Sequence, residues 1–138
     1  VTLSGTVQVL APTYVASATS LTMDNTNVGA TASKTFTVSN TGTAPLLVTG
    51  ITVTGADAAQ FVVNPASFAL AVGAQPQAVT VSFTPASTGV RSASISIFHN
   101  AAGSPGTVTV TGTGVQAAAP VMSVSKSSMN FGEVLLGQ

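Results

Sequence analysis

Apolar and polar residues alternate along most of this chain with a period of two. Phe36 and Val38 alternate with Thr and Ser, and the same pattern returns at Val79, Val81 and Phe83. Such alternation, in segments rich in Val, Thr, Ile and Phe, is typical of strands that bury one face. No segment places apolar residues at the i, i+3, i+4 spacing of an amphipathic helix. The pattern therefore predicts an all-β fold.

Turn-forming residues separate these segments, as at Asn40-Thr41-Gly42 and from Pro85 to Gly89. Seven to eight short strands in about 100 residues predict two packed antiparallel sheets, an immunoglobulin-like β-sandwich. We expect strands at Ser20–Met23, Thr35–Ser39, Leu46–Thr54, Gln60–Asn64, Ser67–Ala71, Ala78–Thr84, Ser92–His99 and Thr107–Thr113. The side chains expected to point inward are Phe36, Val38, Val79, Val81, Phe83, Ile95, Ile97, Val108 and Val110.

The two ends of the sequence resemble each other. VTLSGT at Val1–Thr6 corresponds to VTVTGT at Val108–Thr113, and after one extra Gly the match continues through Pro12 and Pro120, at an offset of 108 residues. A fixed offset of this kind is the signature of repeated structural units. The sequence therefore predicts one unit of an array.

The repeat divides the chain into four parts. Residues 1–6 are the closing strand of a preceding repeat, 7–19 a Pro-containing linker, 20–115 a complete sandwich, and 116–138 the linker and opening strand of a following repeat. Two interpretations fit this division. Either the units follow one another in one polypeptide, or separate subunits complete one another by strand exchange.

Charge is scarce, at 4% of residues with a formal net charge of zero, compared with about a quarter of residues in ordinary domains. Lys and Arg form no cluster that could neutralise phosphates, which argues against nucleic acid as a partner. No apolar run approaches the ~20 residues of a membrane helix, so membrane insertion is not expected. A nearly uncharged polar surface favours association and suits a secreted or cell-surface protein.

Candidate chemistry is sparse. His99 is the only His and no Cys is present, so we interpret it as a solvated loop residue without the partners that a metal site needs. Asp57 follows Gly55 in a turn and is expected to bond its own backbone. Arg91 is expected to solvate a strand edge or to meet a carboxylate of the next unit. We expect no enzyme activity, no catalytic residues, no metal site and no cofactor.

Two further motifs have alternative interpretations. Gly112 and Gly114 could suggest a nucleotide-binding loop, but no helix follows to present amide groups to a phosphate. Calcium needs several oxygen ligands, and only Asp24 and Glu133 could add carboxylates to Asp57. Neither motif predicts a ligand site.

Short motifs recur in a fixed order along the chain: Val28-Gly29, Asn40-Thr41-Gly42 with Pro45, Gly55-Ala56-Asp57 before Phe61, Phe83-Thr84-Pro85 with Gly89, and Gly112-Thr113-Gly114. Taken in this order, they resemble the ASH (ASPM, SPD-2, Hydin) and major-sperm-protein-like group of immunoglobulin folds. Among these, the chain looks most similar to the bacterial repeats called choice-of-anchor D. The resemblance implies a seven-stranded sandwich, usually in series, and no catalytic residues. Such repeats occur in large secreted or surface-anchored bacterial proteins and, in eukaryotes, in ciliary and centrosomal ones, and the near-absence of charge favours the bacterial setting. Asp24-Asn25 departs from the family, which tends to have Phe-Gly there.

These features together predict a non-catalytic structural repeat of an extracellular bacterial filament, stalk or cell-surface protein. Its partners are expected to be neighbouring copies of the same repeat, met through strand edges and inter-repeat junctions. The alternative is an adhesin or carbohydrate-binding surface module with glycans as ligands. That alternative calls for exposed aromatic side chains, and the sequence offers one Tyr, Tyr14, and no Trp.

Overall fold

A computed structural model describes residues 2–120 and residue 132 of this chain. In that part of the chain, short strands account for the regular structure, together with one turn of 3-10 helix and no α-helix. The elements are β1 Tyr14–Ala16, β2 Ser20–Thr22, β3 Thr26–Asn27, β4 Ala32–Asn40, β5 Leu46–Thr54, η1 Ala58–Gln60, β6 Phe61–Asn64, β7 Phe68–Leu70, β8 Gln77–Phe83, β9 Gly89–His99 and β10 Gly106–Val115.

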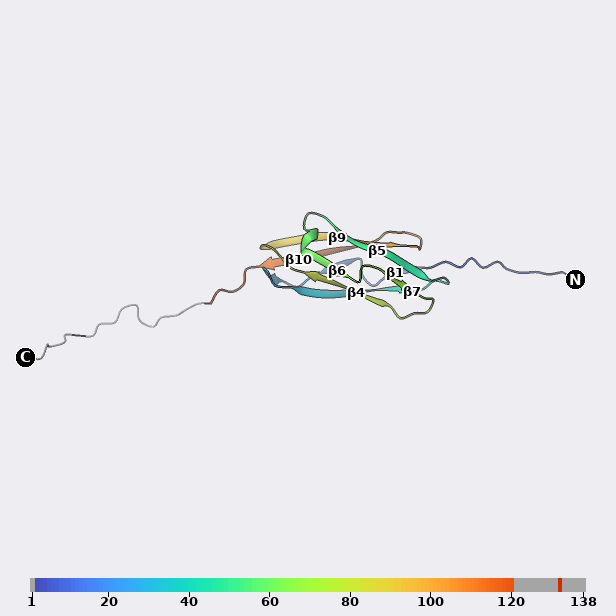
Figure 1. The fold of residues 1–138 in the computed structure, drawn as a ribbon, viewed down its shortest axis with the longest axis horizontal. Coiled ribbons are helices and arrows are strands. Elements are labelled where there is room, and N and C mark those ends of the chain that lie inside the picture. Colours follow the sequence, from blue (N-terminus) through green and yellow to red (C-terminus); the bar gives the residue numbers. More distant parts are fainter. Residues whose placement is uncertain (1, 121–131, 133–138) are drawn as a thin grey trace, which may run out of the picture.

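Two sheets pack face to face as a sandwich (Figure 1). One sheet has the order β1-β4-β8-β6, and the other has the order β2-β10-β9-β5-β7 with β3 also paired to β10. Most neighbouring strands are antiparallel, but β2 and β3 run parallel to β10. The prediction of an all-β, immunoglobulin-like sandwich is confirmed, and all eight expected strands are present.

The chain changes sheets at its beginning. β1 pairs with the end of β4 in one sheet, after which β2 and β3 pair with β10 in the other. The linker predicted over residues 7–19 is therefore shorter, because Tyr14–Ala16 already belongs to the sandwich. Residues 2–6 form no strand here, so their assignment to a preceding repeat stays a prediction. The opening strand expected within 116–138 lies outside the described residues.

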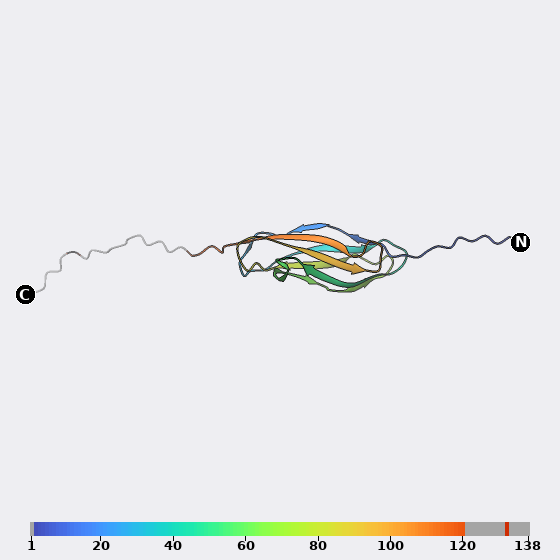
Figure 2. The same cartoon turned by 90° about the horizontal axis from the view of Figure 1, so that it is seen from above.

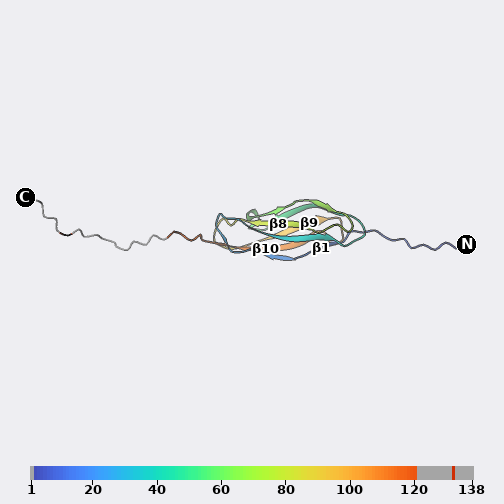
Figure 3. The ribbon, with the colours of Figure 1, turned by 90° about the horizontal axis from the view of Figure 1, so that it is seen from below.

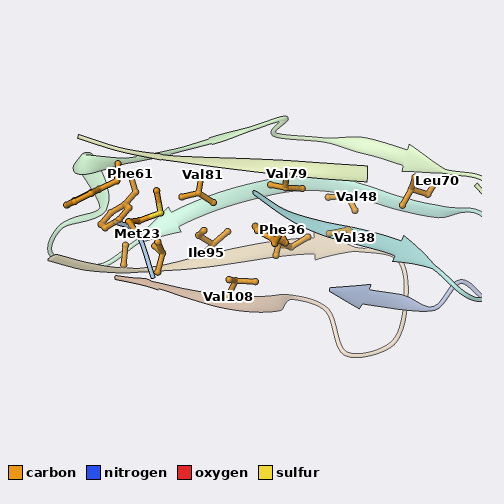
Figure 4. Packing of buried hydrophobic residues seen from close by; sticks show 14 of the residues in the cluster. Met23, Phe36, Val38, Val48, Phe61, Leu70, Val79, Val81, Ile95 and Val108 are labelled. Carbon is orange, nitrogen blue, oxygen red and sulfur yellow. The ribbon is translucent and has the colours of Figure 1, made fainter. Parts of the chain in front are cut away.

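The core lies between the sheets and is built from the inward faces of the alternating segments (Figure 4). All nine side chains expected to point inward are buried, each at most 2% exposed. Full burial of a Val, Ile or Phe side chain contributes roughly 1.5–3 kcal/mol. Met23, Leu46, Val48, Phe61 and Leu70 complete most of the remaining core.

The chain arrives at one end of the sandwich and leaves from the opposite end (Figures 1, 2 and 3). We call the end where residues 2–13 arrive the N-terminal end, which carries loops 41–45, 71–76 and 100–105. The end that residues 116–120 leave is the C-terminal end, with loops 28–31, 55–60 and 84–88. This arrangement makes the two ends the natural places to look for function.

Candidate functional site: the two ends of the sandwich

One buried amide organises the N-terminal end. The side chain of Asn40 is 6% exposed, and its Oδ1 accepts hydrogen bonds from the backbone N–H groups of Thr13 at 3.2 Å and Gly42 at 3.0 Å. Its Nδ2 donates to the carbonyls of Ala44 at 2.8 Å and Leu70 at 3.2 Å. Asn40 therefore uses its full hydrogen-bonding capacity to join the arriving chain, a loop and β7.

The loop after Asn40 also binds the N-terminal segment through backbone hydrogen bonds to Ala11. The carbonyl of Ala11 accepts from the N–H groups of Thr43 at 2.8 Å and Ala44 at 3.2 Å, and the N–H of Ala11 donates to Thr43 Oγ1 at 3.2 Å. A Cβ on Gly42 would lie 2.3 Å from the carbonyl oxygen of Ala11, closer than real atoms approach. We call this contact between residues 40–44 and 11–13 the N-terminal clamp, and it gives the Asn-Thr-Gly motif a structural role.

An aromatic stack closes the core beside the clamp. The rings of Tyr14 and His99 lie 4.2 Å apart at an angle of 7°. Gly106 leaves the space for it, because a Cβ there would lie 2.6 Å from the Tyr14 ring. The interpretation of His99 as a solvated loop residue is wrong, since His99 is 7% exposed and is the last residue of β9. His99 follows Ile95 and Ile97 at the same spacing of two residues. The alternation in the sequence therefore already indicated that its side chain points inward.

Burial shapes the protonation of this stack. Nδ1 of His99 accepts from the N–H of Ala101 at 3.2 Å, which places the proton of the neutral ring on Nε2. Nε2 and the Tyr14 hydroxyl are buried with no hydrogen-bond partner among the described residues. Desolvation lowers the pKa of His99 and raises the pKa of Tyr14. Burial therefore favours the neutral form of His99, which packs against the ring of Tyr14.

Close backbone contacts fix the C-terminal end. The N–H of Val28 donates to the carbonyl of Val115 at 2.9 Å, next to the pairing of β3 with β10. A Cβ on Gly114 would lie 2.3 Å from the carbonyl oxygen of Ser87, and one on Gly112 would lie 2.6 Å from the Phe83 ring. The glycines of the closing motif thus allow close packing, which accounts for them without a nucleotide.

An ion pair braces the same end. Arg91 Nη1 lies 3.5 Å from Asp57 Oδ1, and Arg91 also donates to Ser87 Oγ and to the Thr88 carbonyl. Asp57 Oδ2 accepts from the backbone N–H of Ser92 at 3.1 Å. Two expectations are therefore corrected. Asp57 bonds the β9 backbone instead of its own turn, and Arg91 finds its carboxylate within this sandwich.

A second ion pair on the described surface joins Lys34 Nζ and Asp24 Oδ1 at 2.9 Å. Asp24 and Asp57 are thus each engaged by a different cation. Within residues 2–120 and 132, no group of three His, Cys, Asp or Glu side chains could hold a metal ion. Glu133, which the calcium alternative needs, lies outside the described residues.

The family model of the HYDIN/CFA65/VesB-like Ig-like domain matches residues 16–113. The chain belongs to this family. The match begins within β1 and ends within β10, so it covers nearly the whole sandwich. A search of curated proteins found no match.

Solved structures share the fold at low sequence identity. The ASH/PapD-like domain 7 of human CEP192 has a TM-score of 0.63 at 16% identity, and the match covers 85% of this chain and 95% of that one. The SafA pilin–SafB chaperone complex of Salmonella enterica gives 0.55 at 19%, covering 81% and 58%. The family model, together with the shared fold, confirms the ASH-like resemblance, while the nearer likeness to choice-of-anchor D repeats stays a prediction.

Enzymes also appear among the matches. The Vibrio cholerae VesB protease has a TM-score of 0.54 at 17% identity, but the match covers only 32% of that chain and 75% of this one. At this identity the similarity shows the fold alone. Within residues 2–120 and 132, no helix is long and apolar enough to cross a membrane.

Proposed function

We propose that this chain is a non-catalytic structural repeat of an extracellular bacterial filament, stalk or cell-surface protein. The observation that carries the proposal is the position of the two chain ends. The chain arrives at one end of the sandwich through the N-terminal clamp and leaves the other beside Val28, with hydrogen bonds at both places. A domain held in this way can transmit position and tension along a series of copies.

The covalent version of the array has the better support. Thr2–Thr6 repeats the sequence of β10, yet the place that such a strand takes in a sandwich is already filled here. β10 itself pairs with β9 on one side and with β2 and β3 on the other. Strand exchange through these residues would have to displace β10, whereas a preceding unit in the same polypeptide would simply use them as its own last strand.

Composition and the PapD-like fold support the proposed location at the cell surface. A chain with 4% charged residues and zero net charge gives little repulsion between neighbouring copies. The PapD-like folds among the matches include the pilin–chaperone complex, which supports protein–protein contact in general. The glycan-binding alternative has less support, because Tyr14 is stacked on His99 and the exposed large aromatic in the described part is Phe98, at 41%.

Electron microscopy of the protein purified from its source tests this function. We expect fibres or stalks with an axial repeat related to the length of one sandwich. Monodisperse short particles that bind members of a glycan panel would contradict the proposal and would favour the adhesin alternative. Particles that bind no glycan and form no fibre would contradict both.

A further inference from the structure

The structure fixes how much free chain can separate two consecutive units. β10 ends at Val115, whose carbonyl is bound by Val28, and the N-terminal clamp begins at Ala11. At the offset of 108 residues, Ala11 corresponds to Ala119 and Pro12 to Pro120. Only residues 116–118 therefore remain between the last strand of one sandwich and the clamp of the next.

Three residues reach a short distance. Fully extended chain spans at most about 3.3–3.6 Å per residue, so Val115 and Ala119 are at most about 14 Å apart. The Pro that follows biases the preceding Ala toward an extended conformation and stiffens the junction. From this reach we infer that consecutive units touch, with the C-terminal end of one seated on the N-terminal end of the next. The inference rests on the proposed function.

Exposed apolar residues support contact at the preceding junction. Val7, Val9 and Leu10 are 94%, 82% and 63% exposed in this structure, although they are large apolar side chains. At the same offset Val7 corresponds to Val115, so Val9 and Leu10 fall in the three-residue link. The C-terminal end of a preceding copy is the surface within their reach, and burial there would remove their apolar area from water.

Charge presents no obstacle to this contact. Among the described residues, the charged side chains are Asp24, Lys34, Asp57 and Arg91, and each is placed in an ion pair within the sandwich. Loops 41–45, 71–76 and 100–105 of the N-terminal end carry no Asp, Glu, Lys or Arg. The two ends can therefore approach without leaving a buried charge unpaired.

The partner that contacts the N-terminal end is thus a second copy of this unit, and the three-residue link holds it there. The residues expected at the contact are those next to the two chain attachments. They are Gly29, Ala30 and Ser87 on the C-terminal end, and Gly42 and Thr43 beside Val9 and Leu10 on the N-terminal side.

A two-unit protein tests this contact. Residues 11–115 are joined directly to residues 8–120, which keeps the native link Gln8-Val9-Leu10. The first copy contains the whole core, because every buried core residue lies between Met23 and Val110. The chain has no Cys, so single Cys residues at exposed Ala86 of the first copy and Ala102 of the second accept spin labels selectively.

Electron–electron distance measurement is expected to give one narrow distribution. A variant with about ten Gly and Ser residues inserted before Gln8 provides the flexible reference and is expected to give a broad distribution. Changing Val9 and Leu10 to Ser is expected to broaden the distribution of the directly joined protein, whereas V62S, an exposed Val on β6, leaves it narrow. Equal widths in the directly joined and spaced proteins would overturn the inference.

Failure of this inference and failure of the proposed function give different experimental results. A broad distribution in the directly joined protein removes the contact between units but leaves a tandem array of jointed units. Evidence that the native polypeptide contains a single sandwich removes the array, whatever the two-unit protein does.

Discussion

Asn40 joins three separate pieces of backbone with one side chain. We therefore expect it to contribute more to the stability of the fold than most polar residues do. Its amide meets Thr13, Gly42, Ala44 and Leu70, and it is almost fully buried. The sequence marked Asn40-Thr41-Gly42 as a turn but contained no sign of the partner, because Ala11–Thr13 is distant in the chain and has no strand pattern. The sequence therefore predicted the Asn-Thr-Gly turn but not its contact with residues 11–13.

We expect N40A to destabilise the sandwich by about 3 kcal/mol, since it removes four hydrogen bonds and leaves buried partners unsatisfied. Urea unfolding of the chain measures the change. N100A is the matched control, because Asn100 bonds Leu47 and Pro45 from an exposed position. Its expected cost is below about 1 kcal/mol. Equal losses in the two variants would contradict the role assigned to Asn40.

Burial of His99 is expected to make the folded protein less stable as the pH falls. Burial lowers its pKa in the folded state, so the folded protein binds the proton less tightly than the unfolded chain. The contribution of neutral His99 to the free energy of unfolding is therefore complete above the ordinary histidine pKa of about 6.5, and it decreases as the pH falls below that value. Thermal unfolding between about pH 7.5 and 5 should show this loss. H99F keeps the stack without a titrating group, and a similar loss in H99F would refute the assignment.

At the scale of elements, the period of two placed the long strands well and missed two of the short ones, β1 and β3. β5 has the predicted bounds Leu46–Thr54, and the inward residues of β4, β8, β9 and β10 are all buried. β1 and β3 are three and two residues long, too short to show alternation. Their pairing depends on β4 and β10, which lie far along the chain, so local sequence carried no signal for them.

The change of sheet by the first strands leaves part of an edge open. β1 covers β4 only from Val38 to Asn40, and no described strand pairs with residues 32–36 on that side. Lys34 lies at this open edge, on the same face as Phe36 and Val38, and its Nζ reaches the Thr22 carbonyl at 2.7 Å and Asp24. An inward-pointing charge at an edge opposes pairing with another molecule.

Replacing this charge is expected to promote edge-to-edge association. K34V should form dimers or larger species, because the edge of β4 then presents a β-branched residue with no charge to bury. Light scattering after size exclusion measures the change. T109V alters an exposed residue of β10 that is paired on both sides, with Ser20 of β2 and Ser94 of β9, and is expected to stay as wild type. A monodisperse K34V protein would show that Lys34 does not protect the edge.

For the whole molecule, the fold was predictable from the sequence and its mode of assembly only in outline. The offset between Pro12 and Pro120 predicted repetition, but the placement of the two chain ends at opposite ends of the sandwich came from the structure. The support for one polypeptide over strand exchange also came from the structure, because strand exchange through residues 1–6 would require the place of β10 to be free. β10 fills that place with ten residues, Gly106–Val115.

The mass of the denatured native polypeptide tests the central claim most directly. Protein from the source organism is boiled in detergent, separated by size and detected with an antibody raised against residues 20–115. A covalent array predicts one very large band, or a ladder with steps of one repeat of 108 residues. A single band near 13.5 kDa would contradict the covalent array and would favour separate subunits.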